Sequence, residues 1–367
     1  MAEVIALTNL DFEYELASQN PSYRPLPLLS DLSKRWRFLL RLLPGSERAD
    51  CLNPEILQRL IKPHQFRSKS DRFLVWGVTP RSSRIAGYLG LEKSFPPVCV
   101  VRTFNDKRFS HRLEKQLNVS LPYSGVIDSP EQLQNAVKAC PHDWVLKHPF
   151  GVSGRERMVG KASQLSESAL GWARRRFRDG WSLLFEPWVE QRTDFSFHFQ
   201  IDPDSSVHEL GYCHLLPDPG GVYRGNRVTP TIPPNAQALE VAKQIAAILA
   251  ERGYWGPLGI DSFCGLLGKT PVLRPLVEIN ARHSFGRLAL ALSRYLPHEW
   301  SYLWWHPNRA EMPKALARIP ALAESSGLKP GAYSLPVNVD PQRESGTILL
   351  TAPTPQRLQE LEASLIP

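Results

Sequence analysis

Three polar side chains end an apolar segment in the last third of the chain. Residues 272–279 are apolar enough for a buried strand, yet Glu278, Asn280 and Arg282 lie at alternate positions at its end. A pleated strand directs all three side chains to one face. An unpaired buried carboxylate costs on the order of several kcal/mol, whereas carboxylate and amide oxygens are the ligands that Mg²⁺ prefers. This face therefore predicts a magnesium site whose remaining ligands come partly from substrate phosphates.

A second carboxylate is predicted on the same face. Residues 256–280 have the pattern of a β-hairpin that turns near 268–269. With that turn, Asp261 lies opposite Leu276 and shares a face with Glu278. A slip of one residue would move Asp261 to the other face. The alternative for the whole segment is a surface ladder of ion pairs with Arg274, Arg282 and Arg287, which its apolar flanks disfavour.

A lysine and a glycine-bearing loop form the second signal. Lys147 ends the apolar strand of "VLKHPF", and Gly151, Ser153 and Gly154 follow within a few residues. Glycines let backbone N–H groups approach phosphate oxygens, while the lysine supplies a point charge. The segment lacks the spacing of a Walker loop. Taken alone, it is also typical of an ordinary strand connection.

Two further carboxylates flank a break between strands. Glu186 follows the apolar run "LLF", and Asp194 begins an alternating strand with Phe195, Phe197 and Phe199 on one face. Such a segment can present backbone groups to an adenine edge and a carboxylate to ribose hydroxyls. The alternative is a solvated acidic hairpin between two strands.

Strand-like and helix-like segments alternate along the chain and must position these residues. Strands are predicted at 72–78 and 96–102, each followed by a helix, which indicates a small parallel sheet. Residues 217–235 are loop-like, 236–253 form a helix closed by Gly253, and the tail has a strand and a helix. The aromatic run at 298–307 indicates a buried packing anchor. We predict a mixed α/β fold in at least three pieces.

Composition narrows the classes of partner. The 367 residues are 42% hydrophobic and 22% charged, with a net charge of +8, which favours an anionic partner. Five scattered cysteines, an acidic N-terminus and the lack of a long apolar run predict a cytoplasmic protein without a membrane span. The arginine-rich segment 172–181 is typical of a solvated helix face, so we do not expect nucleic acid as a partner.

Several of these signals occur together in one known family. Lys107 after "FND", Lys147 with "HPFGVSG", then "FEPWVEQRTDF", "GIDSF" and "VEINAR" have the order and rough spacing of ATP-grasp enzymes. The resemblance covers about residues 105–292, and the Glu-Ile-Asn-Ala-Arg sequence is similar to the E-x-N-x-R signature of the family's metal strand. "WGVTPRSSRIAGYLG" resembles the smaller α/β domain that usually precedes this fold.

The resemblance implies a role for each candidate residue. ATP would be bound by Lys107, Lys147, Gly151, Ser153, Gly154, Glu186, Val189 and Asp194, of which Glu186 and Val189 match the adenine hinge and Asp194 the ribose ligand. Magnesium, with manganese as an alternative, would be held by Asp261, Glu278 and Asn280. Arg282 and Lys147 would be catalytic, with Arg282 beside the reacting carboxylate. Phe150, Arg155 and Glu156 depart from the small residues usual in the family's mobile loop.

The implied organisation is an N-terminal small α/β domain over 1–104, a lid subdomain over 105–182, a metal- and substrate-binding subdomain over 183–300, and a strand–helix extension over 301–367.

The implied activity is that of an ADP-forming carboxylate–amine ligase, in which a carboxylate becomes an acyl phosphate and an amine, expected on an amino acid or peptide, displaces phosphate. The alternatives are a kinase, a nucleotide-binding protein without turnover and, more distantly, a basic nucleic-acid-binding protein. Arg224 and Arg227 either bind the substrate carboxylate or rim an exposed loop.

Overall fold

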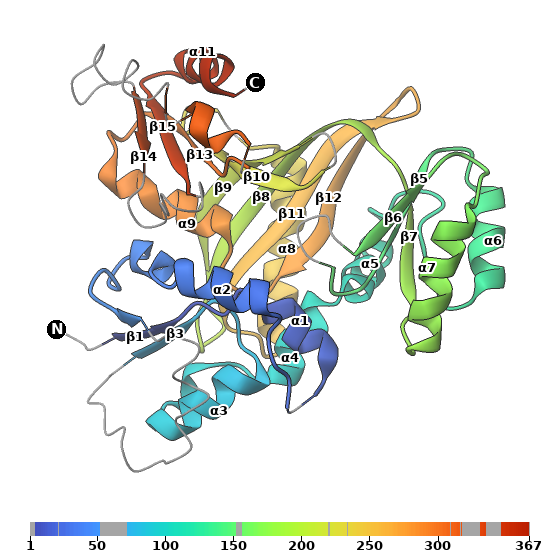
Figure 1. Cartoon of the computed structure of the whole chain (residues 1–367), viewed down its shortest axis with the longest axis horizontal. Coiled ribbons are helices and arrows are strands. Elements are labelled where there is room, and N and C mark those ends of the chain that lie inside the picture. Colours follow the sequence, from blue (N-terminus) through green and yellow to red (C-terminus); the bar gives the residue numbers. More distant parts are fainter. Residues whose placement is uncertain are drawn as a thin grey trace.

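Three β-sheets organise the chain (Figure 1). The computed structural model describes residues 4–20, 22–51, 72–151, 156–218, 221–232, 234–308, 310–315, 317, 331–334 and 346–366. The N-terminal sheet lies at the lower left of Figure 1, the largest sheet runs through the centre, and a four-stranded sheet lies to the right. This arrangement confirms the predicted mixed α/β fold class.

The N-terminal sheet is parallel, with strand order β2-β1-β3. Its elements are β1 (Val4–Leu7), α1 (Phe12–Ser18), α2 (Pro27–Arg35), the 3-10 helix η1 (Leu39–Leu42), β2 (Asp50–Cys51), β3 (Arg72–Val75), α3 (Pro80–Leu89) and the 3-10 helix η4 (Glu92–Ser94). Helix α3 begins with a capping box between Thr79 and Ser82 and ends at Gly90, where φ is +69°. The predicted strand–helix unit at 72–91 is confirmed.

The predicted strand at 96–102 is wrong, because this segment is part of helix α4 (Val98–Asn105). Its valines have the composition of a strand, but its buried side chains, Val101, Phe104 and Asn105, lie three and four residues apart, as on one face of a helix. Helix α5 (Lys107–Gln116) follows at once, because the Asp106 side chain accepts a hydrogen bond from the Arg108 backbone N–H and caps it.

The four-stranded sheet is antiparallel, with order β4-β7-β5-β6. Its elements are β4 (Gly125–Ile127), α6 (Pro130–Ala139), β5 (Trp144–Lys147), β6 (Arg157–Gly160), α7 (Glu167–Arg178) and β7 (Leu183–Pro187). Helices α6 and α7 lie side by side and bury their apolar faces against Trp144, Leu146 and Phe185 (Figure 1). The boundary predicted at 182/183 is therefore misplaced, because β7 belongs to this sheet.

The largest sheet has eight strands in the order β12-β11-β8-β9-β10-β13-β15-β14. They are β8 (Glu190–Ile201), β9 (Val207–Pro217), β10 (Tyr223–Val228), β11 (Gly256–Leu267), β12 (Thr270–Asn280), β13 (Ser301–Trp305), β14 (Gly331–Ser334) and β15 (Ile348–Ala352). Helices α8 (Ala236–Glu251), α9 (Phe285–Leu292) and α11 (Pro355–Leu365), with the 3-10 helix η5 (Ser293–Tyr295), accompany it. Strands β13, β14 and β15, which fall in the predicted extension at 301–367, continue this sheet rather than forming one of their own.

Strand β10 corrects the loop predicted at 217–235. The density of glycine and proline suggested a loop, but β10 pairs with both β9 and β13 inside the sheet. A Cβ atom on Gly225 would lie 2.5 Å from the Trp304 carbonyl oxygen. This glycine therefore permits close approach of two backbones rather than a turn.

The β11–β12 hairpin turns at 268–269 as predicted, but its register changes part-way along. Phe263 pairs with Arg274, in the predicted register, whereas Asp261 pairs with Glu278 and not with Leu276. The extra residues lie on β12 around Pro275, which has no N–H to donate and whose carbonyl accepts a hydrogen bond from the Ser262 hydroxyl. Because the shift is even, Asp261 keeps the predicted face.

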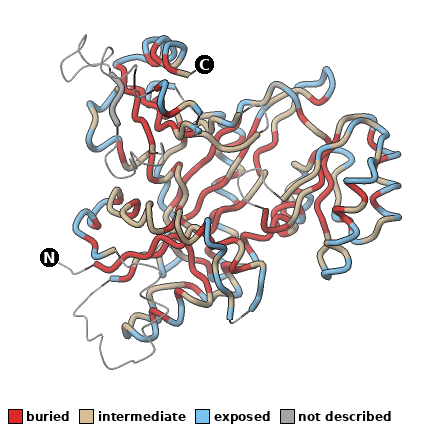
Figure 2. Tube along the Cα trace, viewed as in Figure 1, coloured by how far each residue is buried: buried red, intermediate tan, exposed pale blue. Residues whose placement is uncertain are grey.

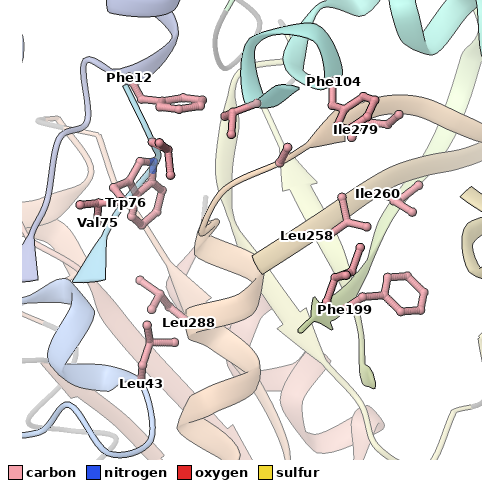
Figure 3. Packing of buried hydrophobic residues seen from close by; sticks show 14 of the residues in the cluster. Phe12, Leu43, Val75, Trp76, Phe104, Phe199, Leu258, Ile260, Ile279 and Leu288 are labelled. Atoms are coloured by element: carbon pink, nitrogen blue, oxygen red, sulfur yellow. The ribbon is translucent and has the colours of Figure 1, made fainter. Parts of the chain in front are cut away.

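One apolar core joins the N-terminal sheet to the largest sheet. Figure 3 shows Phe12, Val75 and Trp76 on one side and Leu258, Ile260 and Phe199 on the other. In Figure 2 the buried positions accordingly run through the centre of the molecule. The predicted row of Phe195, Phe197 and Phe199 is buried. Among the described residues, no helix is both long and apolar enough to cross a bilayer.

Candidate active site

A cavity of about 530 Å³ opens between the four-stranded sheet and the largest sheet. Strands β5 to β12 and the first residues of α5 and α9 supply its lining. It brings together ten of the predicted site residues, namely Lys107, Lys147, Gly151, Glu186, Val189, Asp194, Asp261, Glu278, Asn280 and Arg282. Ser153 and Gly154 lie outside the described residues.

Two carboxylates face each other in this cavity. Asp261 and Glu278 are directly opposed on β11 and β12, and Asn280 Nδ2 donates to Asp261 Oδ2 at 3.0 Å. Burial, followed by the charge of Glu278, raises the pKa of Asp261 to about 6. No cluster of three or more His, Cys, Asp or Glu side chains suited to a metal occurs in the described part of the chain. The oxygen donors at this site are two carboxylates and an amide. This set fits a magnesium ion whose other ligands are phosphate oxygens.

Lys107 connects Glu278 to the loop after β5. Its Nζ lies 2.7 Å from Glu278 Oε1 and donates to the Gly151 carbonyl oxygen, also at 2.7 Å. The lysine is buried at the first position of α5, where the Asp106 cap fixes the start of the helix. A cation and an anion are thus held in contact at the cavity wall.

Arg282 reaches from the end of β12 to the N-terminal domain. Its Nε donates to Glu13 Oε1 on α1 at 2.6 Å, and one of its terminal nitrogens donates to the His283 carbonyl oxygen. Glu13 was not predicted as a site residue. The two residues are 269 positions apart, so only the folded chain reveals the pair.

Lys147 belongs to a buried network of alternating charges. Its Nζ lies 2.5 Å from Glu186 Oε2, and Arg274 Nη2 lies 2.5 Å from Glu186 Oε1. Arg274 is also bidentate with Glu114, at 2.7 and 2.9 Å. Burial alone would raise the pKa of Glu186, but the charges of Arg274 and Lys147 hold that pKa well below its ordinary value. Glu186 therefore positions Lys147 and is fully occupied by its two cations.

An apolar slot lies beside this network. Its walls are Val145, Pro187, Val189, Phe263 and Val277. The Arg192 guanidinium covers the Phe263 ring at 4.1 Å and pairs with Asp194 at the rim. A flat apolar slot with a carboxylate at its edge can accept a planar base attached to a polar sugar.

The opposite end of the cavity is aromatic. Tyr223 and Phe285 stack at 5.6 Å with an interplanar angle of 21°. His198 is also part of this wall, and burial, followed by the charge of Arg287, lowers its pKa to about 3, so it is neutral at pH 7. A side chain at Gly286 would collide with His198, so this glycine preserves the space.

Solved structures with a similar fold cover between 81% and 100% of the chain. A carboxyaminoimidazole ribonucleotide synthase from Aspergillus clavatus, complexed with ATP, has a TM-score of 0.59 at 14% identity and covers 100% of this chain and 97% of its own. An N5-carboxyaminoimidazole ribonucleotide synthetase from Thermus thermophilus has a TM-score of 0.57 at 16% identity, with the same coverage. The biotin carboxylase domain of a Hydrogenobacter thermophilus 2-oxoglutarate carboxylase, in complex with MgADP, ADP and bicarbonate, has a TM-score of 0.54 at 15% identity, covering 81% and 80%.

These neighbours are ATP-grasp proteins. The chain has the ATP-grasp fold. The resemblance seen in the sequence is thereby confirmed at the level of the fold.

A curated relative adds a likeness in sequence. The [Butirosin acyl-carrier protein]--L-glutamate ligase of Niallia circulans is 29% identical over 194 residues, which are 51% of this chain and 45% of that protein. The chain therefore matches less than half the length of this curated relative. No family model matches the sequence.

Two predicted substrate residues lie outside the ATP-grasp cavity. Arg224 pairs with Glu311, and Arg227 is bidentate with Glu362 on α11. Both arginines are on β10, inside the sheet, and these ion pairs occupy their guanidinium groups. Neither predicted alternative fits, because they neither line the cavity nor rim an exposed loop.

Sequence reasoning missed Arg274 and Glu114 as members of the site. Arg274 was considered only as part of a surface ladder, but it is buried and lines the cavity. The available signal was a lone arginine in an apolar strand. Such an arginine requires buried carboxylates as partners.

Proposed function

We propose that this protein is an ATP-dependent ligase that joins a carboxylate to an amine and releases ADP and phosphate. The observation that carries the proposal is the pair of opposed carboxylates, Asp261 and Glu278, in a cavity that also holds two lysines and Arg282. The resemblance of the sequence to ATP-grasp enzymes implies this role for the same residues, which supports the proposal. The curated relative is itself a ligase by name, which supports the same class.

In the proposed reaction, a substrate carboxylate oxygen attacks the γ-phosphorus of ATP, and the bond from that phosphorus to the leaving ADP oxygen breaks. The amine nitrogen then attacks the carbonyl carbon of the acyl phosphate, the bond from carbon to the phosphate oxygen breaks, and the nitrogen loses a proton. Bound magnesium would neutralise charge on the terminal phosphates. Asp261, Glu278 and Asn280 would hold that ion.

The cationic side chains would position and neutralise the reacting groups. Lys147 projects into the cavity from the end of β5, and its pairing with Glu186 fixes its direction. Arg282, held by Glu13, would stabilise negative charge on the acyl phosphate. Lys107 is paired with Glu278. We infer that, when the nucleotide binds, Lys107 pairs with its phosphates and Glu278 becomes a ligand of the metal.

The nucleotide base would occupy the slot between Val145, Val189 and Phe263, with Asp194 toward the ribose. Asp194 is paired with Arg192, so ribose binding would exchange one hydrogen-bond partner for another. The aromatic end near Phe285 would then be left for the substrate that is activated.

We further propose that an amino acid or peptide supplies one of the two substrates. The name of the curated relative gives an acyl-carrier protein and L-glutamate as the two substrates that it joins. A cytoplasmic location is also proposed, from the scattered cysteines alone.

A mass-spectrometric screen tests the proposal. Pairs of carboxylic acids with amino acids or short peptides are incubated with the full chain, ATP and magnesium, and both nucleotide and condensed product are quantified. ADP release that requires both the acid and the amine, with a product lighter than their sum by one water, is expected. ADP release with a stable phosphorylated product and no amine dependence would instead identify a kinase.

A further inference from the structure

A second cavity, of about 520 Å³, lies between the N-terminal sheet and the starts of β11 and α9. Its wall runs along β3 and the following turn, and Trp76, Phe95 and Trp255 give it aromatic surface. Leu43, Val75 and Trp76, which Figure 3 shows on the N-terminal side of the core, also belong to this wall. Arg282 lines both cavities.

The charge of this second cavity is one-sided. Arg72, Lys93, Arg282 and Arg287 line it, and no carboxylate among the described residues does. Arg282 is neutralised by Glu13, but no described carboxylate pairs with any of the other three. Arg287 is half-buried, and its two terminal nitrogens donate to neutral oxygens, those of the Phe199 carbonyl and the Gln200 amide. Burial lowers the pKa of Arg287 to about 10, so it is still a cation at pH 7.

Two buried hydrogen-bonding atoms of this wall have no partner among the described residues. One is Arg287 Nε and the other is His283 Nδ1, on a side chain that is 5% exposed. Burial and the charges of Arg287 and Arg72 lower the pKa of His283 well below its ordinary value. A buried polar atom without a partner carries the full cost of its desolvation, and unpaired cations that converge on one cavity repel one another. An anion in the cavity would relieve both costs.

We propose that the second cavity binds a small dianion with an apolar or aromatic body, whose charged group lies between Arg72, Arg287 and Lys93. The three unpaired cations favour two negative charges over one, and the aromatic wall favours a flat body. A phosphate monoester and a dicarboxylate both meet this description. This site shares only Arg282 with the cavity of the proposed ligase site, and its existence does not depend on the ligase activity.

Calorimetry with phenyl phosphate, phthalate and neutral benzamide tests the proposal on the full chain. At least one of the two dianions should bind in a 1:1 ratio and benzamide should not, and the better dianion distinguishes a phosphate from a dicarboxylate ligand. The variant Arg72→Gln should weaken that binding by about tenfold or more, the scale of one charge-assisted hydrogen bond. Arg72 is exposed, so this change should leave the fold intact.

A matched variant identifies the site. Arg84→Gln removes the same charge from an exposed position on α3 in the same domain, and Arg84 lines neither cavity. It should bind the dianion like the wild type. Failure of both dianions to bind, equal binding of benzamide, or equal affinities in Arg72→Gln and the wild type would overturn the proposal.

Discussion

Replacing Lys147 with methionine should weaken nucleotide binding much more than it weakens the fold. Methionine keeps most of the side-chain volume and removes the charge that projects into the cavity. A hydrogen bond to a charged group contributes about 1.5–3 kcal/mol, so the dissociation constant should rise by about 10- to 150-fold. Glu186 would still be paired with Arg274 at 2.5 Å. The loss of stability should therefore be smaller than the roughly 3–5 kcal/mol expected when a buried charge is left alone.

The assay is calorimetric titration of a non-hydrolysable ATP analogue with magnesium, together with a thermal melt. Lys161→Met is the matched control, because Lys161 is an exposed lysine of the same domain that pairs with Asp143 and does not line the cavity. The control should bind like the wild type. Unchanged affinity in Lys147→Met, or an equal loss in the control, would refute the assignment of Lys147 to the phosphates.

Three further predictions concern the neighbours of Lys147 and the metal ligands. Arg274→Met should destabilise the protein by about 3–5 kcal/mol in denaturant melts, because Glu114 loses its bidentate partner, and adding Glu114→Gln should recover part of that loss. Asp194→Ala should weaken ATP much more than inorganic triphosphate, and equal losses in calorimetry would mean that Asp194 does not contact ribose. Asp261 has a pKa of about 6 in the folded protein, above its ordinary value of 3.8, so ionising its carboxyl group opposes folding. Without magnesium, Asp261→Asn should therefore be more stable than the wild type by up to about 3 kcal/mol at pH 7.5 and by about half of that at pH 5. Melts that show no such pH dependence would contradict the raised pKa.

The local pattern of the sequence was sufficient to predict which face of the β11–β12 hairpin carries the candidate metal ligands. Alternation along β12 placed Glu278 and Asn280 together, and the turn at 268–269 placed Asp261 with them. The bulge at Pro275 shifted the pairing by an even number, so an inexact register still gave the correct face.

The partners of these residues could not be predicted in the same way. The Glu13–Arg282 pair and the Glu114–Arg274 pair join positions 269 and 160 residues apart, and no local periodicity encodes such contacts. The two wrong predictions, a strand at 96–102 and a loop at 217–235, have the same origin. Packing against neighbouring elements overrode the strand composition of the valine run and the loop composition around Gly225.

The most direct test of the central claim is the identity of the nucleotide product and its dependence on Glu278. Product chromatography on the wild type, with magnesium and a substrate pair from the screen, should give ADP and phosphate. Glu278→Gln keeps the shape of the side chain but removes the charge that would hold the metal, so it should fold normally and lose about 10²-fold or more in rate. AMP and pyrophosphate as products, or full activity in Glu278→Gln, would contradict the account.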